Sequence, residues 1–207
     1  MIAGALAAVA QLVAGSTVRW LGCAPTEDQR VYIANHSSHL DFIVLWSYLP
    51  ARLRRLTRPV AARDYWERGA VRRYLAAKVF NAVLIDRAAA PSTPAGQLGL
   101  QAVDQMVQSL ADRHSLILFP EGARGPGEDL APFRSGLYHL CARRPGLEVV
   151  PVYLENLNRI LPKGHLLPVP MLSRITFGTP LRLQDAEAKD AFLERARQAI
   201  QALKEAV

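Results

Sequence analysis

Short apolar runs alternate along the chain with longer segments whose apolar positions recur at helical spacing. The short runs are rich in Val, Ile and Leu and are bounded by charged or turn-forming residues, which is typical of strands buried in a sheet. On this basis we predict strands at residues 30–34, 58–62, 80–85, 115–119, 148–153 and 172–177.

The longer segments predict helices between these strands. Leu100, Val103, Val107 and Leu110 recur at helical spacing and form one apolar stripe. The predicted helices cover residues 40–48, 65–78, 97–113, 135–143 and 185–206. Strands that alternate with helices indicate an α/β fold, with a central mixed sheet flanked by helices.

The first fifteen residues form an apolar, Ala-rich segment interrupted only by Gln11. The segment is shorter than the roughly 20 residues that a spanning helix needs, and it lacks the basic start of a signal peptide. We therefore predict a membrane-associated helical segment over residues 1–20, with Trp20 at headgroup depth, and one domain over residues 21–207. A helix buried against the domain is the alternative.

Positive charge is concentrated in one stretch of the chain. Residues 51–78 contain nine basic and two acidic side chains, whereas the whole chain carries a formal net charge of +7. Such a patch predicts a polyanionic partner, either a phospholipid surface, an acidic carrier protein, a phosphorylated substrate or nucleic acid. Aromatic residues hardly interleave the stretch and no nucleic-acid motif is present, which argues against nucleic acid.

Composition excludes two further classes of protein. Half of the residues are apolar, which is ample for a packed core and argues against disorder. The two cysteines, Cys23 and Cys141, form neither a metal-type spacing nor a disulfide framework, so we expect free thiols in a reducing compartment.

The first chemically informative motif is Asn-His-Ser-Ser-His-Leu-Asp, residues 35–41, directly after a predicted buried strand. Histidine is suited to removing a proton near neutral pH, and a carboxylate can orient its ring. His36 and Asp41 would not share one face of a helix, but they can meet if His36 lies in the turn and Asp41 in the following helix. We predict His36 as a general base and Asp41 as its partner, with Ser37 or Ser38 capping the helix.

Two other roles for this motif are weaker. His36, His39 and Asp41 offer three metal-ligand side chains, but no further His or Cys cluster in the sequence supports a metal site. A serine nucleophile would need a G-x-S-x-G turn, which the sequence lacks.

The second motif is Phe-Pro-Glu-Gly-Ala-Arg-Gly, residues 119–125, again directly after a buried strand. A glycine-rich backbone and an arginine at the edge of a sheet can hold a phosphate through charge-assisted hydrogen bonds. If Glu121 is buried it needs a partner, and we expect a nearby arginine. An ordinary surface loop is the alternative for this motif taken alone.

Together the two motifs resemble the glycerolipid acyltransferase family that includes 1-acylglycerol-3-phosphate acyltransferases. Two weaker blocks lie in the family's order: residues 84–87, Leu-Ile-Asp-Arg, and residues 150–152, Val-Pro-Val. Residues 133–136, Phe-Arg-Ser-Gly, resemble the segment that follows the Pro-Glu-Gly block. The resemblance covers about residues 30–181.

The resemblance implies roles for individual residues. His36 and Asp41 would be catalytic, Arg87 and Arg124 would hold the acceptor phosphate, Glu121 and Gly122 would shape that site, and Pro151 would be a structural residue near the acyl site. The implied reaction moves a fatty acyl chain from acyl-CoA or acyl carrier protein to the free hydroxyl of a lysophospholipid. It requires no cofactor or metal, and 1-acyl-sn-glycerol 3-phosphate is the expected acceptor.

The sequence departs from the family pattern at two positions. Ala123 stands where Thr or Ser is usual, and Gly125 where Ser is common, so a hydroxyl that could bind the phosphate is missing. One hydrogen bond contributes about 0.5–1.5 kcal/mol, enough to change the preferred acceptor without abolishing activity. Another lysolipid acceptor is therefore one alternative. The basic patch and the apolar N-terminus suggest a second, a non-catalytic lipid-binding or membrane-docking protein.

The resemblance and the apolar start of the chain also predict where the protein works. We expect membrane association at a cytoplasmic face, and the high Ala and Arg content favours the inner membrane of a GC-rich bacterium. The expected partners are the acyl donor, the lysophospholipid and the membrane surface, with no nucleic acid.

Overall fold

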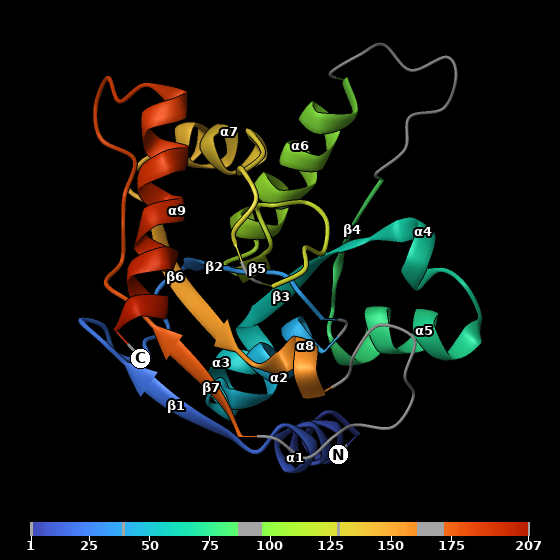
Figure 1. Ribbon diagram of the computed structural model, residues 1–207. Helices are drawn as coiled ribbons and strands as arrows, with labels where there is room; N and C mark the ends of the chain where they lie inside the picture. The colour runs from blue at the N-terminus through green and yellow to red at the C-terminus, as the bar shows by residue number, and fades with distance from the viewer. Residues whose placement is uncertain (1, 39, 87–96, 128, 161–171, 207) are drawn as a thin grey trace.

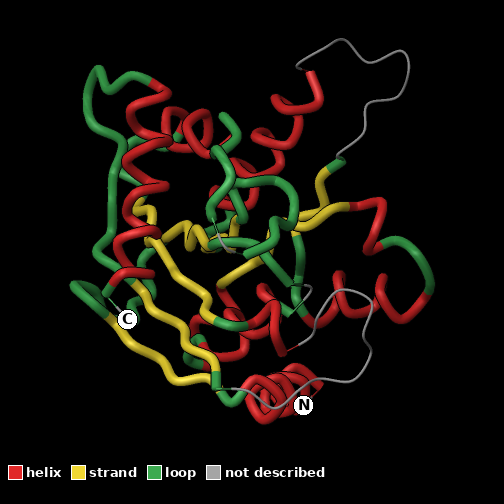
Figure 2. Tube along the Cα trace, viewed as in Figure 1, coloured by secondary structure: helices red, strands yellow, loops and turns green. Residues whose placement is uncertain are grey.

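A computed structural model describes residues 2–38, 40–86, 97–127, 129–160 and 172–206. In this part of the chain, seven strands form one sheet in the order β1-β7-β6-β2-β5-β3-β4. Helices cover both faces of the sheet (Figures 1 and 2). The predicted α/β fold with a central mixed sheet is therefore confirmed.

The strands and helices have the following bounds. The strands are β1 Ser16–Trp20, β2 Arg30–Ala34, β3 Thr57–Ala62, β4 Val83–Ile85, β5 Ser115–Leu118, β6 Glu148–Glu155 and β7 Ser173–Phe177. The helices are α1 Ile2–Ala14, α2 Asp41–Tyr48, α3 Ala51–Leu56, α4 Arg63–Trp66, α5 Ala70–Tyr74, the π-helix η1 Leu75–Val79, α6 Gln97–Ala111, α7 Gly136–Arg143, α8 Leu157–Ile160 and α9 Lys189–Glu205.

The direction of the strands determines where the motifs meet. Strands β6, β2, β5, β3 and β4 are parallel to one another, whereas β7 is antiparallel to β6. The carboxyl ends of the five parallel strands therefore lie along one edge of the sheet. Both motifs follow the carboxyl end of such a strand, the position at which open α/β sheets bind ligands.

Two apolar layers hold the helices on the sheet, and β2 contributes to both. Val31 and Ile33 pack with α6, α7 and α9, whereas Tyr32 and Ala34 pack with α1, α2 and α3. All five residues of β2 are buried, which explains why this central strand reads as a continuous apolar run apart from Arg30. Burial of one such aliphatic side chain contributes about 1.5–3 kcal/mol to the stability of the fold.

The end of the predicted N-terminal segment belongs to the sheet. Residues 16–20 form β1, which pairs in parallel with β7, and Trp20 stacks on Phe177 with ring centroids 3.8 Å apart. Trp20 is thus half-buried against the sheet, and its headgroup depth stays a prediction. Helix α1 packs on α2 through Ala7 and Ala14. Within the described chain, no helix combines the length and apolarity needed to cross a membrane.

The helix predicted at residues 65–78 is interrupted. Gly69 has φ of +87°, a left-handed conformation that glycine adopts without strain and that ends α4 before α5 begins. The segment then continues as η1, where the Phe80 N–H bonds the Leu75 carbonyl at 2.9 Å. Because η1 extends to Val79, the strand predicted from residue 80 begins only at Val83.

Candidate active site

His36 and Asp41 meet as their spacing predicts. His36 lies in the turn after β2 and Asp41 begins α2, with Nδ1 of His36 2.9 Å from Oδ2 of Asp41. The Asp41 side chain is fully buried, whereas that of His36 is 22% exposed. Because a carboxylate accepts the Nδ1–H, Nε2 at the opposite edge of the ring is the nitrogen that can take a proton.

Asp41 also organises the turn that carries His36. Its Oδ2 accepts hydrogen bonds from the backbone N–H groups of Ser37 at 2.7 Å and Ser38 at 2.8 Å. Leu40 precedes α2 and its side chain makes no capping bond, whereas the hydroxyl of Ser38, one of the two predicted caps, accepts the Leu40 N–H at 3.2 Å. The amides of the turn donate to the first residue of the helix, because the buried Asp41 carboxylate is within reach of both.

Asn35 and Phe119 fix the turn and the imidazole further. The Asn35 side chain donates to the Leu154 carbonyl at 2.9 Å and accepts from the Leu154 N–H at 2.7 Å, which ties the turn to β6. The ring of Phe119 stacks on the ring of His36, with centroids 4.2 Å apart and planes inclined by 24°. This contact fixes the orientation of the ring.

Glu121 joins the two motifs. Its buried carboxylate accepts the His36 N–H at 2.8 Å through Oε1 and the Ala131 N–H at 3.0 Å through Oε2. The Gly125 N–H in turn bonds the His36 carbonyl at 2.9 Å. Among the described contacts the partners of this carboxylate are backbone amides rather than the expected arginine, so Glu121 holds the His36 turn in position.

Replacing Glu121 with Gln is expected to destabilise the protein by about 1–3 kcal/mol, because the single amide oxygen can accept only one of the two N–H groups that the buried carboxylate accepts. Urea denaturation monitored by circular dichroism measures the change. Asp129→Asn is the matched control, since Asp129 lies in the same loop and is exposed. We expect the control to stay within about 0.5 kcal/mol; equal midpoints for both variants would contradict the role of Glu121.

A cavity of about 270 Å³ contains His36 and Arg124. Most of its wall is apolar and comes from α2, β3 and α4, whereas Gly122 and the exposed Arg124 belong to the second motif. The residues that line it include Leu40, Phe42, Ile43, Val60, Tyr65, Trp66, Leu118 and Phe119. A proton acceptor, a cation and an apolar wall therefore share one space.

A second cavity of about 490 Å³ adjoins the first, since Ile85, Leu118, Phe119 and Gly122 line both. Helix α6 forms part of its wall, and Arg134 is one of the residues that line it. Arg134 donates from its backbone N–H to the Pro120 carbonyl at 2.8 Å, so the 133–136 segment packs on the second motif. Arg134 is a site residue that was not predicted, although the resemblance of residues 133–136 to the family segment was a signal for it.

Gly122 occupies a position that only glycine fits. Its φ is +74°, and a Cβ atom there would collide with the guanidinium of Arg134. The close approach of the loop backbone to Arg134 therefore depends on this glycine.

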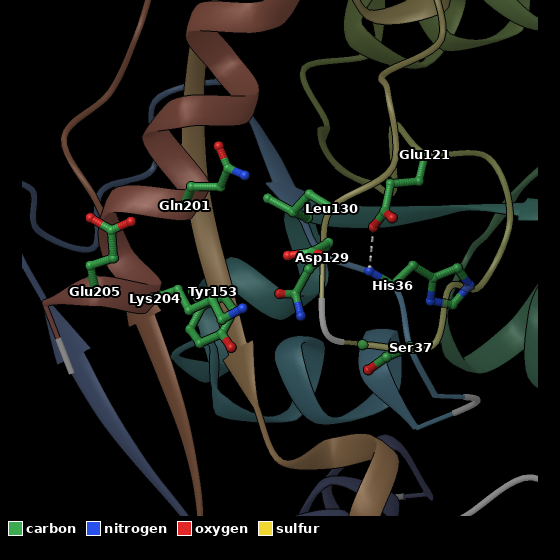
Figure 3. A pocket seen from close by; sticks show the side chains of 11 residues that line it. His36, Ser37, Glu121, Asp129, Leu130, Tyr153, Gln201, Lys204 and Glu205 are labelled. Carbon is green, nitrogen blue, oxygen red and sulfur yellow. Dashed lines mark hydrogen bonds between the residues drawn. The ribbon is translucent and has the colours of Figure 1, made fainter.

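A third cavity, of about 280 Å³, lies on the other side of the His36 turn. Tyr153 of β6 and Gln201, Lys204 and Glu205 of α9 line it. Figure 3 shows the Glu121 carboxylate directed at the backbone nitrogen of His36, while the imidazole points away from the α9 side chains. His36 therefore lines the third cavity as well as the first, but its ring stacks on Phe119 and points away from the α9 side chains.

Pro151, a further predicted site residue, is separated from this arrangement. Pro151 is buried in the middle of β6, where its carbonyl accepts the Gly178 N–H at 2.8 Å, and it lines none of these three cavities. Arg87 and His39 lie outside the described residues. No group of three potential metal-binding side chains occurs within the described ranges.

The two cysteines are free thiols, as predicted. Burial raises the pKa of Cys141 to about 12, so this thiol stays protonated at neutral pH. Burial also raises the pKa of the half-buried Cys23.

Comparison with known proteins identifies the family. A family model described as Acyltransferase matches residues 17–155, which include both motifs. The chain therefore belongs to the Acyltransferase family, and the predicted family is confirmed.

Individual relatives agree with this assignment. The chain is 26% identical over 186 residues to a 1-acyl-sn-glycerol-3-phosphate acyltransferase of Limnanthes alba, covering 84% of this chain and 60% of the relative. It is 31% identical to Taffazin of Dictyostelium discoideum, covering 68% of this chain and 49% of that protein. The chain thus spans about 60% of the length of the first relative.

A solved structure supports the fold independently. The crystal structure of the 1-acyl-sn-glycerophosphate acyltransferase PlsC from Thermotoga maritima matches with a TM-score of 0.75 at 17% identity. The match covers 99% of this chain and 78% of that chain. At this identity the similarity establishes a shared α/β fold.

Proposed function

We propose that this protein transfers a fatty acyl chain from an acyl thioester to the free hydroxyl of a lysophospholipid, with 1-acyl-sn-glycerol 3-phosphate as acceptor. The observation that carries the proposal is the His36–Asp41 pair at 2.9 Å, beside a cavity that also holds Arg124 and an apolar wall. The name and the matched length of the plant relative support the same reaction.

In the proposed mechanism, Nε2 of His36 takes the proton of the acceptor hydroxyl as its oxygen attacks the thioester carbonyl carbon. The tetrahedral intermediate collapses by breaking the carbon–sulfur bond, and the imidazolium returns the proton to the departing sulfur. Asp41 stabilises the imidazolium through Nδ1, and the stacked Phe119 ring contacts its face. No covalent acyl-enzyme and no cofactor take part, and either acyl-CoA or acyl carrier protein fits as donor.

Arg124 is the described cation that we propose for the acceptor phosphate, with Arg87 as the second. Arg124→Ala is expected to lower kcat/KM for lysophosphatidic acid by about 10–100-fold, because a charge-assisted hydrogen bond contributes about 1.5–3 kcal/mol. The same variant should change the rate with monoacylglycerol, which lacks the phosphate, by less than about threefold. Product is measured by mass spectrometry, and Arg19→Ala, at an exposed arginine of β1, is the control.

Equal losses with the two acceptors would contradict the phosphate role of Arg124. If neither acceptor is acylated from either donor, whereas lipid binding is retained, the non-catalytic lipid-binding protein becomes the better account.

Membrane association is part of the proposal. Helix α1 exposes Ile2, Val9 and Leu12, with exposed fractions of 54%, 57% and 84%. A helix with one apolar face packed on α2 and further apolar side chains exposed is suited to lie in a membrane interface. We propose attachment at a cytoplasmic face, where the lysophospholipid is available.

A further inference from the structure

The segment between α4 and η1 projects from the molecule and buries none of its residues. Residues 67–74, Glu-Arg-Gly-Ala-Val-Arg-Arg-Tyr, are all exposed, and α5 within them has no buried residue. We name these eight residues the arm. Figure 1 shows the arm at the margin of the molecule, beyond the edge strand β4. Such exposure requires an explanation, because a helix in a globular protein usually buries one face.

The arm is nevertheless held firmly at both ends. Trp66 before it and Phe80 after η1 are buried, with ring centroids 5.9 Å apart, and Phe42 of α2 contacts both rings edge-on. Ala76 of η1 is also buried. The aromatic cluster therefore presents the arm as a fixed projection on the body of the domain.

The side chains of the arm combine positive charge with apolar surface. Val71 is 72% exposed and Tyr74 is 47% exposed, and their i, i+3 spacing places them on one side of the helix. Arg68, Arg72 and Arg73 are exposed around them, while the acidic Glu67 is paired with Arg63 at 2.9 Å. Apolar side chains flanked by arginines suit an anionic lipid interface, where the rings and aliphatic groups insert and the guanidinium groups contact phosphates.

The arm also borders the cavity that contains His36. Arg72 lies over the ring of Tyr65 at 4.4 Å, and Tyr65 and Trp66 line that cavity together with His36 and Arg124. A surface that is attached to the membrane at the arm would bring the wall of this cavity close to the bilayer.

We propose that the arm is a membrane-contact surface that docks on anionic phospholipid and holds the His36 cavity at the bilayer. The positioning of the His36 cavity for catalysis rests on the proposed acyl transfer. The docking of the arm on phospholipid does not depend on that function. A folded acidic carrier protein would be attracted by the arginines alone, whereas a bilayer also accommodates Val71 and Tyr74. The exposed apolar pair therefore favours the lipid surface.

The test is co-sedimentation of the full chain with phosphatidylcholine vesicles that contain or lack phosphatidylglycerol. Arg73→Glu is expected to weaken binding to the anionic vesicles by about fivefold or more, an effect that high salt removes. Val71→Glu is expected to weaken it about tenfold, a loss that high salt reduces only in part because the apolar contact is also removed. The matched control for Arg73→Glu is Lys189→Glu on α9, whose side chain is 48% exposed. The matched control for Val71→Glu is Leu100→Glu on α6, a residue that is also 48% exposed. Both controls should bind as the wild type does.

Because the arm has no buried helical residue, these variants should fold normally, which circular dichroism checks. Equal vesicle binding by Val71→Glu and Leu100→Glu would overturn the proposal. So would loss of binding to an acidic acyl carrier protein, but not to vesicles, in Arg73→Glu. If the wild type shows no acyl transfer but the arm variants still lose vesicle binding, the docking surface stands and only the proposed function fails.

Discussion

Turnover in the His36→Ala variant is expected to fall about 10²–10⁴-fold, the usual contribution of one general base. The side chain that the variant removes offers Nε2 as the proton acceptor, because Nδ1 is engaged by Asp41 at 2.9 Å. The KM for the acceptor should change little, since the apolar wall and Arg124 remain. Initial rates across a range of lysophosphatidic acid concentrations separate the two parameters.

The control for this variant is His139→Ala. His139 lies on α7, where its ring contacts Tyr138, and it lines none of the three cavities described above. We expect it to retain the wild-type rate within about twofold. A normal kcat in His36→Ala would refute the base assignment, provided that the wild type and the variant share one far-ultraviolet circular dichroism spectrum.

The second large effect is expected at Asp41, where Asn should lower kcat by about 10²-fold or more. The backbone N–H groups of Ser37 and Ser38 require an acceptor at the position of Oδ2, so the amide oxygen should occupy it and keep the turn intact. The variant then lacks the negative charge that stabilises the imidazolium, and its NH2 group takes the place of Oδ1, a buried atom with no hydrogen-bond partner among the described residues. We expect the loss to appear in kcat, with the acceptor KM near its wild-type value.

Asp104→Asn is a suitable comparison, because Asp104 is an exposed carboxylate on α6 that pairs with Arg143. Thermal unfolding of both variants shows whether the turn is preserved. Near-normal kcat in Asp41→Asn would mean that the charge of this buried carboxylate plays no part in the reaction.

The fold was predictable where local pattern and tertiary structure agree. The buried strands β2, β5 and β6 are continuous apolar runs, and the amphipathic α6 and α9 have clear helical stripes. Strand β1 was missed because its sequence, Ser-Thr-Val-Arg-Trp, is half polar and becomes a strand by pairing with β7, more than 150 residues later. Such a pairing depends on the whole sheet and leaves no local signal.

The site, like the fold, has a local part that the sequence predicted and a long-range part that it did not. His36 and Asp41 were predictable because five residues of chain fix their separation, and both motifs follow strands whose ends meet at one edge. The bond from the His36 backbone to Glu121 joins residues 85 apart, and the bonds from Asn35 to Leu154 join residues 119 apart. Long-range bonds to backbone groups carry no residue-type signature, so the sequence suggested an arginine for Glu121 instead.

The central claim is that the His36–Asp41 pair drives acyl transfer to a lysophospholipid hydroxyl. The most direct test measures thiol release from palmitoyl-CoA and phosphatidic acid formation in the same reaction, with wild type and His36→Ala side by side. A blank without donor corrects for the free thiols Cys23 and Cys141. Our account predicts equal molar amounts of thiol and phosphatidic acid, both dependent on lysophosphatidic acid and on His36; thiol release that continues without the acceptor, or without His36, would contradict it.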